Sequence, residues 1–287
     1  MIGIPAFFTD YQQSVDAELR RLVPESDDAV QRSMAYTLLA PSKRVRPVLV
    51  LLCAELCGGR TARALPIAAA VEMVHAASLI LDDLPSMDDA PLRRGRPTNH
   101  KEFGEAIAIL AAFALLNLSF GTIAAASEAT LAARISKLLS DAVGTDGLVG
   151  GQAADLLATD QSINFEMLER IHRGKTGALF VAAASAGALS AGGAPDAVAS
   201  LAAYAKNLGL AFQIIDDLLD VEGDPAETGK TVRADARKTT FVSFSGVAGA
   251  RQLARELCET ADLALAPFGK RADRLRELSA FVVSRSV

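Results

Sequence analysis

The spacing of apolar residues is the feature that most limits how this chain can fold. They recur at helical intervals along the sequence, and runs of strict alternation bounded by hairpin turns are absent. Apolar residues make up 51% of the chain but aromatic residues only 5%, with no Trp, so Ala, Leu and Val carry the core. Such a core favours helices over strands. The sequence therefore predicts an all-α fold.

The chain length allows one large core. At 287 residues it lies near the size at which a single core stops growing. We find no fixed-period repeat and no linker that divides it, so we predict one domain over residues 1–287. Clusters of Gly, Pro and Asp predict breaks at 23–28, 57–61, 85–99, 144–150, 192–196 and 222–233.

Charge and cysteine content exclude several classes of protein. The net charge is −5 and long basic runs are absent, so a nucleic-acid partner is not expected. The first residues lack the features of a secretory signal. The odd number of cysteines, Cys53, Cys57 and Cys258, argues against a disulfide framework. We expect a cytoplasmic protein.

One uncharged stretch, residues 106–127, is long enough to span a bilayer. It contains Asn117, Ser119, Thr122 and many alanines, and it lacks flanking aromatic or basic anchors. We interpret it as a buried helix at the centre of a helical protein, and we interpret residues 178–194 in the same way. No membrane span is expected.

Two acidic clusters each follow a long apolar helix. The first, DDLPSMDD, contains Asp82, Asp83, Asp88 and Asp89, and Pro85 should make a loop that brings Asp88 back towards Asp82. The second, FQIIDDLLD, places Asp216 and Asp220 on one helix face beside Asp217. Gathered carboxylates repel one another, and magnesium would relieve that repulsion. One such cluster is as often a solvated helix end, but two together favour metal binding.

Basic residues accompany both acidic clusters. Each alone is more often a surface charge than a ligand, but their pairing with acids suits a diphosphate held jointly by metal and protein. They lie in SKRVRP, RRG, HRGKTG, TGK and RKTT, and comprise Lys43, Arg44, Arg46, Arg93, Arg94, Lys175, Lys230 and Lys238.

With these motifs the sequence strongly resembles the trans-isoprenyl diphosphate synthases, the polyprenyl synthetases, and most of all the bacterial geranylgeranyl diphosphate synthases of carotenoid pathways. The resemblance covers about residues 42–250, through SKRVRP, DDLPSMDDAPLRRGRP, GGQAADL, HRGKTGALF, FQIIDDLLDVEGDPAETGK and DARKTT. It departs from the family at Ser42, Leu81, Ala112 and Phe113, as the carotenoid-pathway members do.

The resemblance implies an isoprenoid synthase fold, a helical bundle around a central catalytic cavity, and a homodimer. It implies three magnesium ions per active site, with the ligands Asp82, Asp83, Asp88, Asp155, Asp216 and Asp220, and with a smaller contribution from Asp217. Isopentenyl diphosphate would bind Lys43, Arg46, His75 and Arg94, and the allylic diphosphate (dimethylallyl, geranyl or farnesyl) would bind Arg93, Lys175, Lys230 and Lys238. Thr176 and Gln213, with Gln152 as a weaker candidate, would offer oxygens to the carbocation, so the catalytic set is Lys175, Thr176, Gln213, Asp82 and Asp216.

Product length should depend on side-chain size below Asp82. Ala77 and Ser78 lie five and four positions earlier on roughly the same helix face, and both are small. We therefore favour the twenty-carbon geranylgeranyl diphosphate as the product. Farnesyl diphosphate or a longer product stays open, because Val74, Phe113 or a dimer partner could form the floor.

Three alternatives differ in class. A terpene cyclase shares the first acidic motif, but its second motif usually mixes Asn, Ser or Thr with Glu, whereas this chain has DDLLD. A non-catalytic subunit of a heteromeric synthase would not need both acidic motifs and the lysines. A purely structural helical protein would not need the joined motifs.

Overall fold

The structure, a computed structural model, describes residues 6–222 and 239–284. The predicted all-α fold is confirmed. Each predicted break except the last falls at a junction between two helices, although four of them, 57–61, 85–99, 144–150 and 192–196, extend into the first residues of the next helix. The last runs into residues outside this description. The helices are α1 (Ala6–Leu22), α2 (Ala29–Leu38), α3 (Val45–Leu56), α4 (Thr61–Asp82), α5 (Asn99–Phe103), α6 (Glu105–Ala126), α7 (Ala129–Val143), α8 (Leu148–Ala158), α9 (Phe165–His172), α10 (Ala178–Ser190), α11 (Pro195–Glu222), α13 (Phe241–Ala264) and α14 (Asp273–Ser284), with a π-helical turn η1 (Arg173–Gly177) and a 3₁₀ segment η2 (Ala266–Ala272).

Helix α10 lies at the centre of the fold, as the sequence predicted. It packs against α3, α4, α7 and α11, and apart from Val181 its residues from Leu179 to Ala188 are buried. Small residues permit this close packing. A Cβ added at Gly187 would lie 2.2 Å from the carbonyl oxygen of Val50 on α3, so the two backbones are in contact there.

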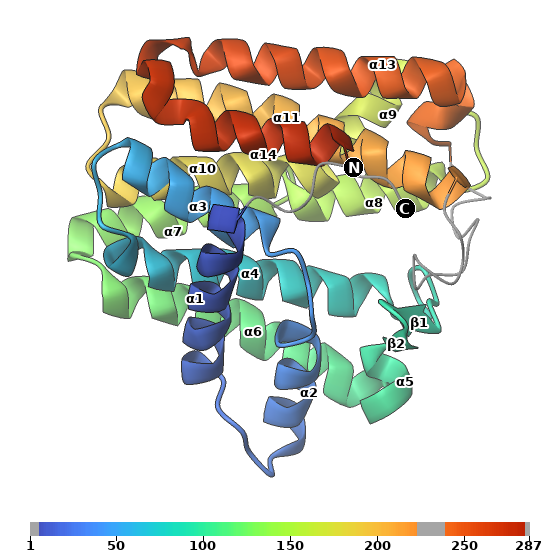
Figure 1. The fold of residues 1–287 in the computed structure, drawn as a ribbon. Helices are drawn as coiled ribbons and strands as arrows, with labels where there is room; N and C mark the ends of the chain where they lie inside the picture. The colour runs from blue at the N-terminus through green and yellow to red at the C-terminus, as the bar shows by residue number, and fades with distance from the viewer. Residues whose placement is uncertain (1–5, 223–238, 285–287) are drawn as a thin grey trace.

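The two acidic helix ends lie on the same side of the molecule. Helix α4 ends at Asp82 and α11 ends at Glu222, and in Figure 1 both helices run towards the side that carries the β1–β2 hairpin. Helices α1 and α2 stand steeply across the others (Figure 1). The fold thus brings two motifs more than 130 residues apart in the sequence to one end of the bundle.

A small hairpin was not expected from the sequence. Strands β1 (Leu92–Arg93) and β2 (Arg96–Pro97) pair antiparallel, with two residues each. The turn residues Arg94 and Gly95 have φ of 53° and 73°, as a type I′ turn requires. The hairpin presents Arg94 at its tip, directly after the first acidic cluster.

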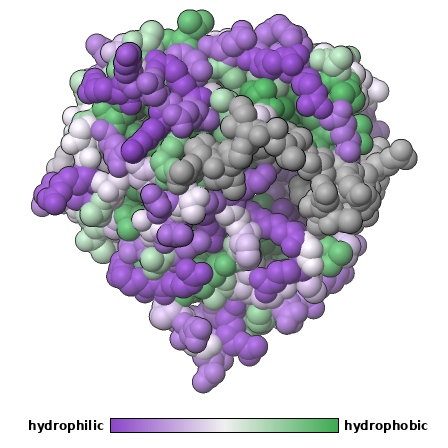
Figure 2. Space-filling model, viewed as in Figure 1, coloured by the Kyte–Doolittle hydropathy of each residue, from purple (hydrophilic) through white to green (hydrophobic). Residues whose placement is uncertain are grey.

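The expectation that residues 106–127 are buried at the centre is wrong. Helix α6 packs on α4, but its other face leaves Ile109, Leu110 and Phe113 46%, 53% and 74% exposed. By length and composition three described helices, α4, α6 and α11, could cross a membrane. On the face seen in Figure 2, hydrophilic residues predominate around smaller hydrophobic patches.

Candidate active site

The first acidic cluster forms a closed loop at the end of α4. The Asp88 N–H donates to the Asp82 carbonyl oxygen at 3.0 Å, so Asp88 returns to Asp82 as predicted. Burial raises the pKa of the Asp82 carboxyl; Lys175 and Arg93 oppose this effect, and the charges of Asp88 and Asp83 add to it. A nearby cation would stabilise the charged form of this carboxylate. The carboxylate oxygens of Asp82 and Asp88 are the type of ligand that magnesium prefers.

Asp83 holds Arg93 rather than facing the same way as Asp82. The Arg93 Nε and Nη2 both donate to the Asp83 carboxylate at 2.7 Å, and Asp83 is 2% exposed. Burial lowers the pKa of Arg93, but the hydrogen bonds and charge of Asp83 outweigh it and raise the pKa. Both oxygens of Asp83 thus orient a predicted diphosphate ligand, and the magnesium role that the resemblance implied for Asp83 stays a prediction.

The π-helical turn η1 carries the predicted catalytic pair Lys175 and Thr176. Lys175 Nζ donates to Asp155 Oδ2 of α8 at 2.7 Å, which joins a predicted substrate ligand to a predicted metal ligand. Gly151 on α8 makes this approach possible, because a Cβ there would lie 2.1 Å from the Lys175 backbone nitrogen. Gly151 was not identified from the sequence as a contact point between α8 and η1, although two glycines in one helix indicate a close backbone approach.

Thr176 and Gln213 are in direct contact, as their predicted shared role requires. Thr176 Oγ1 donates to Gln213 Oε1 at 2.8 Å, and Gln213 Nε2 donates to Asp217 Oδ1 at 2.9 Å. Asp217 Oδ2 also accepts the Phe241 N–H at 3.1 Å, at the start of α13. Asp217 is 4% exposed, so it is turned into the protein, while the partly exposed Asp216 and Asp220 share another face of α11.

A cluster of cationic side chains surrounds His75. Arg46 Nη1 lies 3.4 Å from His75 Nε2, and the Arg46 guanidinium stacks 4.6 Å from the centre of the Phe180 ring. Burial and then the charges of four arginines (Arg46, Arg94, Arg93, Arg44) hold the pKa of His75 well below its usual value. The four lie on two separate segments of the chain, Arg44 and Arg46 at the start of α3 and Arg93 and Arg94 in the hairpin.

Arg46 is the member of this cluster whose positive charge is least stabilised by its surroundings. Burial lowers its pKa to about 10, although the charges of Glu72 and Asp216 oppose that effect. Among the described residues its Nε atom is buried without a hydrogen-bond partner. Arg94 Nη1 donates to the Pro41 carbonyl oxygen at 3.4 Å, which brings the hairpin tip to the loop that carries Lys43. The cluster has a surplus of positive charge that an anion would balance.

The loop that carries Lys43 is fixed from behind by a buried ion pair. Arg44, the residue before α3, has φ of 50°, and it donates to Glu72 at 2.7 Å and Asp16 at 2.8 Å. Gln12 Nε2 also donates to the Lys43 carbonyl oxygen at 3.0 Å. Arg44 is thus a structural residue, a role that the sequence did not distinguish from that of its basic neighbours.

The remaining predicted residues are placed as follows. Ala77 is 4% exposed on α4, and the partly buried Ser78 donates its hydroxyl to the His75 carbonyl oxygen at 2.8 Å. Gln152 Nε2 lies 3.7 Å from the Met87 sulfur in the first acidic loop. Lys230 and Lys238 lie outside the described residues. Within the described ranges, no three His, Cys, Asp or Glu side chains form a preassembled metal cluster.

Comparison with known proteins adds to this geometry. The family model described as polyprenyl synthetase matches residues 27–261. Geranylgeranyl pyrophosphate synthase 11 of Arabidopsis thaliana is 43% identical over 95% of this chain and 80% of its own length. Farnesyl diphosphate synthase of Geobacillus stearothermophilus is 40% identical over 88% of this chain and 87% of its own. The solved geranylgeranyl pyrophosphate synthetase of Pyrococcus horikoshii superposes with a TM-score of 0.89 at 30% identity, over 98% of each chain.

Proposed function

Because this chain belongs to the polyprenyl synthetase family, we propose that it elongates allylic diphosphates with isopentenyl diphosphate and releases mainly geranylgeranyl diphosphate. The chain is a short-chain prenyltransferase, as its relatives of both product classes agree. The length of the product is the part that we propose. Farnesyl diphosphate is the alternative, since relatives named for either product match at similar identity.

The observation that carries this proposal is the unbalanced positive charge around His75. Of the four arginines that act on that ring, Arg44 and Arg93 are paired with carboxylates, which leaves Arg46 and Arg94 to carry that charge. The buried Arg46 Nε also lacks a hydrogen-bond partner among the described residues. A diphosphate supplies several acceptor oxygens and at least two negative charges to such a cluster. We assign isopentenyl diphosphate to this cluster, where Lys43, Arg46, His75 and Arg94 would hold it.

The carboxylates at the ends of α4 and α11 would hold magnesium. The raised pKa of Asp82 supports this assignment, since burial and like charges both favour a bound cation there. The ligands that we propose for three ions are Asp82, Asp88, Asp216 and Asp220. Asp155 would join them after giving up its hydrogen bond with Lys175. Bound magnesium supplies positive charge against the leaving diphosphate.

The protein side chains then act on the allylic substrate. Arg93, fixed by Asp83, and Lys175, fixed by Asp155, hold its diphosphate; the predicted helpers Lys230 and Lys238 lie outside the described residues. The C1–O bond breaks with its electron pair going to the diphosphate oxygen. The Thr176 hydroxyl donates a hydrogen bond to Gln213 Oε1, so lone pairs of both oxygens stay available to stabilise the allylic cation. The double bond of isopentenyl diphosphate forms the new C–C bond, and the departing proton passes to the released diphosphate.

Small side chains on α4 support a twenty-carbon product. The growing chain would run down this helix from Asp82 past Ser78 and Ala77. A helical turn rises about 5.4 Å, close to one isoprene unit, so a bulky side chain at Ala77 would stop growth about one unit earlier. Phe113, which the sequence left as a possible floor, is 74% exposed and does not close this path within one chain.

We also propose a cytoplasmic homodimer, folded as one domain, that serves carotenoid synthesis. The dimer rests on Ile109, Leu110 and Phe113, which place exposed apolar area on one face of α6. Under this proposal α6 is covered by a second copy rather than by lipid. Light scattering during size exclusion would give the mass of a dimer for the native chain and of a monomer for Phe113→Asp. The exposed Leu157→Asp is the matched control and should stay a dimer. A monomer mass for the native chain would remove the dimer assignment, and a dimer mass for Phe113→Asp would remove α6 as its interface.

One assay tests the reaction. The purified protein is incubated with labelled isopentenyl diphosphate, magnesium and, in turn, dimethylallyl, geranyl or farnesyl diphosphate, and the released alcohols are sized by chromatography. Elongation to twenty carbons supports the proposal, and a fifteen-carbon end point supports the alternative product. A cyclised hydrocarbon would indicate a terpene cyclase, and activity only with an added synthase subunit would indicate a regulatory chain. No conversion under any condition would leave a structural role.

A further inference from the structure

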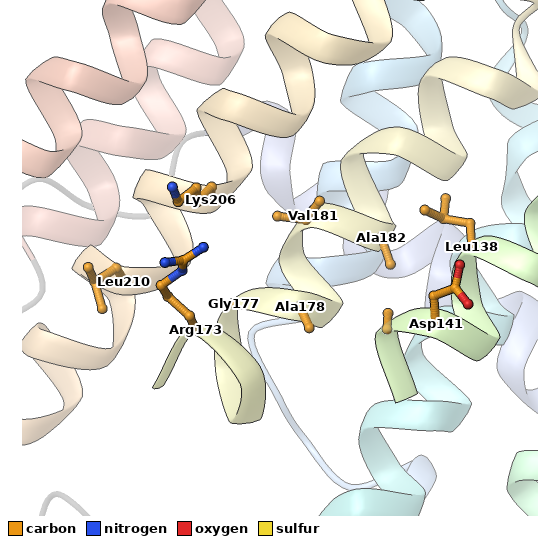
Figure 3. A pocket seen from close by; sticks show the side chains of 10 residues that line it. Leu138, Asp141, Arg173, Gly177, Ala178, Val181, Ala182, Lys206 and Leu210 are labelled. Atoms are coloured by element: carbon orange, nitrogen blue, oxygen red, sulfur yellow. The ribbon is translucent and has the colours of Figure 1, made fainter. Parts of the chain in front are cut away.

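A second pocket lies between α7, η1, α10 and α11, away from the two acidic clusters. It has a volume of about 270 Å³ and is open to solvent. Its walls are apolar and are formed by Leu138, Val181 and Leu210. Its floor is lined by residues with small or no side chains, Ala142, Gly177, Ala178 and Ala182. Figure 3 shows Arg173 and Lys206 together on one side of the pocket, with Asp141 and Leu138 on the opposite side. None of these residues has a place in the reaction described above.

The charged rim of this pocket favours an anion. Neither Arg173 nor Lys206 makes a hydrogen bond or ion pair with any residue in the described part of the chain, and both are exposed. Asp141, the acidic residue at the rim, receives two hydrogen bonds from Lys137 at 2.6 and 2.7 Å, so its charge is already balanced. In a chain of net charge −5, two unpaired cations above an apolar floor form a distinct recognition surface.

The shape and polarity of the pocket narrow the class of ligand. Its volume suits a small molecule of about ten heavy atoms with the head group included, and small-molecule pockets bind ligands whose body is apolar and whose few polar groups are fixed. We propose that this pocket binds a small anionic amphiphile, a single phosphate head with an apolar chain of about six carbons. The phosphate contacts Arg173 and Lys206, and the chain lies against Val181, Leu210 and Leu138.

Occupancy of the pocket acts on the catalytic turn. Arg173 begins η1 and Gly177 ends it, while Lys175 and Thr176 between them make the contacts to Asp155 and Gln213. On α11, Leu210 lines the pocket and Gln213 lies one turn further on. A π-helical turn is a rare and often functional conformation. A ligand in the pocket therefore bears on the same turn from its other side and lowers the turnover rate.

Hexyl phosphate is the test ligand, with 1-hexanol and inorganic phosphate as matched probes that lack its head or its chain. Calorimetry measures the binding of hexyl phosphate directly and needs no turnover. A chelator is added to remove metal ions, so that the phosphate cannot bind through a metal at the acidic clusters. We expect hexyl phosphate to bind at least roughly tenfold more tightly than either probe, because both halves of the pocket are then used. Equal binding of all three would overturn the proposal.

Two variants locate the binding site. Val181→Phe fills the pocket and should weaken hexyl phosphate binding at least roughly tenfold; Lys206→Gln removes one charge and should weaken it roughly fivefold, as expected for one exposed charge pair. Lys270→Gln, on the exposed 3₁₀ segment η2, is the matched control and should bind normally. Unchanged binding in Lys206→Gln, which keeps the apolar floor intact, would overturn the site even if Val181→Phe does not fold.

The effect on turnover rests on the prenyltransferase activity, and kinetics test it separately. With both substrates saturating, hexyl phosphate should lower kcat of the native chain and of Lys270→Gln, and this effect should weaken in Lys206→Gln. If excess substrate abolished the inhibition equally in all variants, the ligand would act at the acidic clusters. That result would refute an effect of the pocket on the η1 turn. A chain without turnover would leave the calorimetric result standing, so failure of the reaction and failure of the pocket are distinguishable.

Discussion

The Asp217 carboxylate accepts a hydrogen bond from Gln213 Nε2 at 2.9 Å, and this single contact determines which end of the Gln213 amide faces Thr176. A carboxylate only accepts, so the nitrogen must turn towards Asp217 and the oxygen towards Thr176. Thr176 Oγ1 then donates to that oxygen at 2.8 Å and keeps its own lone pairs for the cation. The second aspartate of DDLLD, buried in the protein, thus orients the two side chains to which we assign stabilisation of the cation.

Replacing Asp217 with Asn should reverse this amide. The Phe241 N–H keeps its hydrogen bond to the one oxygen of the new amide at position 217, so the nitrogen of that amide faces Gln213. Gln213 must then turn its own oxygen towards position 217 and its NH₂ group towards Thr176. We expect kcat to fall about tenfold, the effect of about 1.4 kcal/mol, with KM for both substrates nearly unchanged. Steady-state kinetics of Asp217→Asn, Gln213→Ala and the double variant provide the check. If the two single losses in kcat simply multiply, Asp217 does not act through Gln213.

Removing one carboxylate from either acidic cluster should disable the reaction. Asp82→Ala and Asp216→Ala each take away a group that positions positive charge at the leaving oxygen, and each should lower kcat by at least roughly 100-fold. The exposed Asp10→Ala on α1 serves as the control and should keep the native rate. Near-normal turnover in both active-site variants, measured at saturating magnesium, would remove the metal assignment.

A larger side chain on α4 should shorten the product. Ala77→Tyr fills the path below Asp82, so the main product should become one isoprene unit shorter, with the rate of the first condensation retained. Chromatographic sizing of the prenyl alcohols measures this change. Ala133→Tyr, at an exposed position of α7, controls for the substitution itself. An unchanged product distribution in Ala77→Tyr would show that the floor lies elsewhere.

His75 should make the folded state sensitive to acid. Its pKa in the folded protein lies well below the usual 6.5, because of burial and then the charges of Arg46, Arg94, Arg93 and Arg44. Below pH 6.5 the unfolded chain therefore binds a proton at this position that the folded chain does not, and the free energy of unfolding falls by up to about 1.4 kcal/mol per pH unit. Above pH 7.5 this contribution is constant.

Urea unfolding of the native chain and of His75→Gln, from pH 7.5 to 5.5, measures this dependence. The difference in unfolding free energy between the two proteins should shrink or reverse as the pH falls, because only the native chain carries the titrating ring. Other groups cancel in the difference. Parallel curves over the whole range would mean that the ring is not held neutral.

Much of this arrangement was predictable from the sequence, because helical spacing and charge clusters are local signals. The all-α fold and the return of Asp88 to Asp82 follow from such signals, whereas the contact of Thr176 with Gln213 was not predicted and required the structure. The two-residue strands around Arg94 are too short for an alternating pattern. The exposed face of α6 was missed because the helix is apolar on all sides, and its sequence therefore does not indicate which face meets solvent.

The roles of paired aspartates required the structure. Neighbouring residues on a helix point about 100° apart, so one aspartate of each pair is partly exposed while the other is buried in the protein. For Asp83 the inner partner is Arg93, and for Asp217 it is Gln213. These partners cannot be read from the motif alone, because a tertiary contact determines each of them. The pairing of Lys175 with Asp155 is likewise a contact between separate helical segments.

The missing side chain at position 151 offers a way to weaken this catalyst without altering any charge. Its backbone lies where a single methyl group would collide with the peptide nitrogen of Lys175, at 2.1 Å. Alanine at this position would displace the lysine from its acidic neighbour while leaving the number and kind of ionisable groups unchanged. For an engineer, this glycine separates the steric demands of the site from its electrostatics.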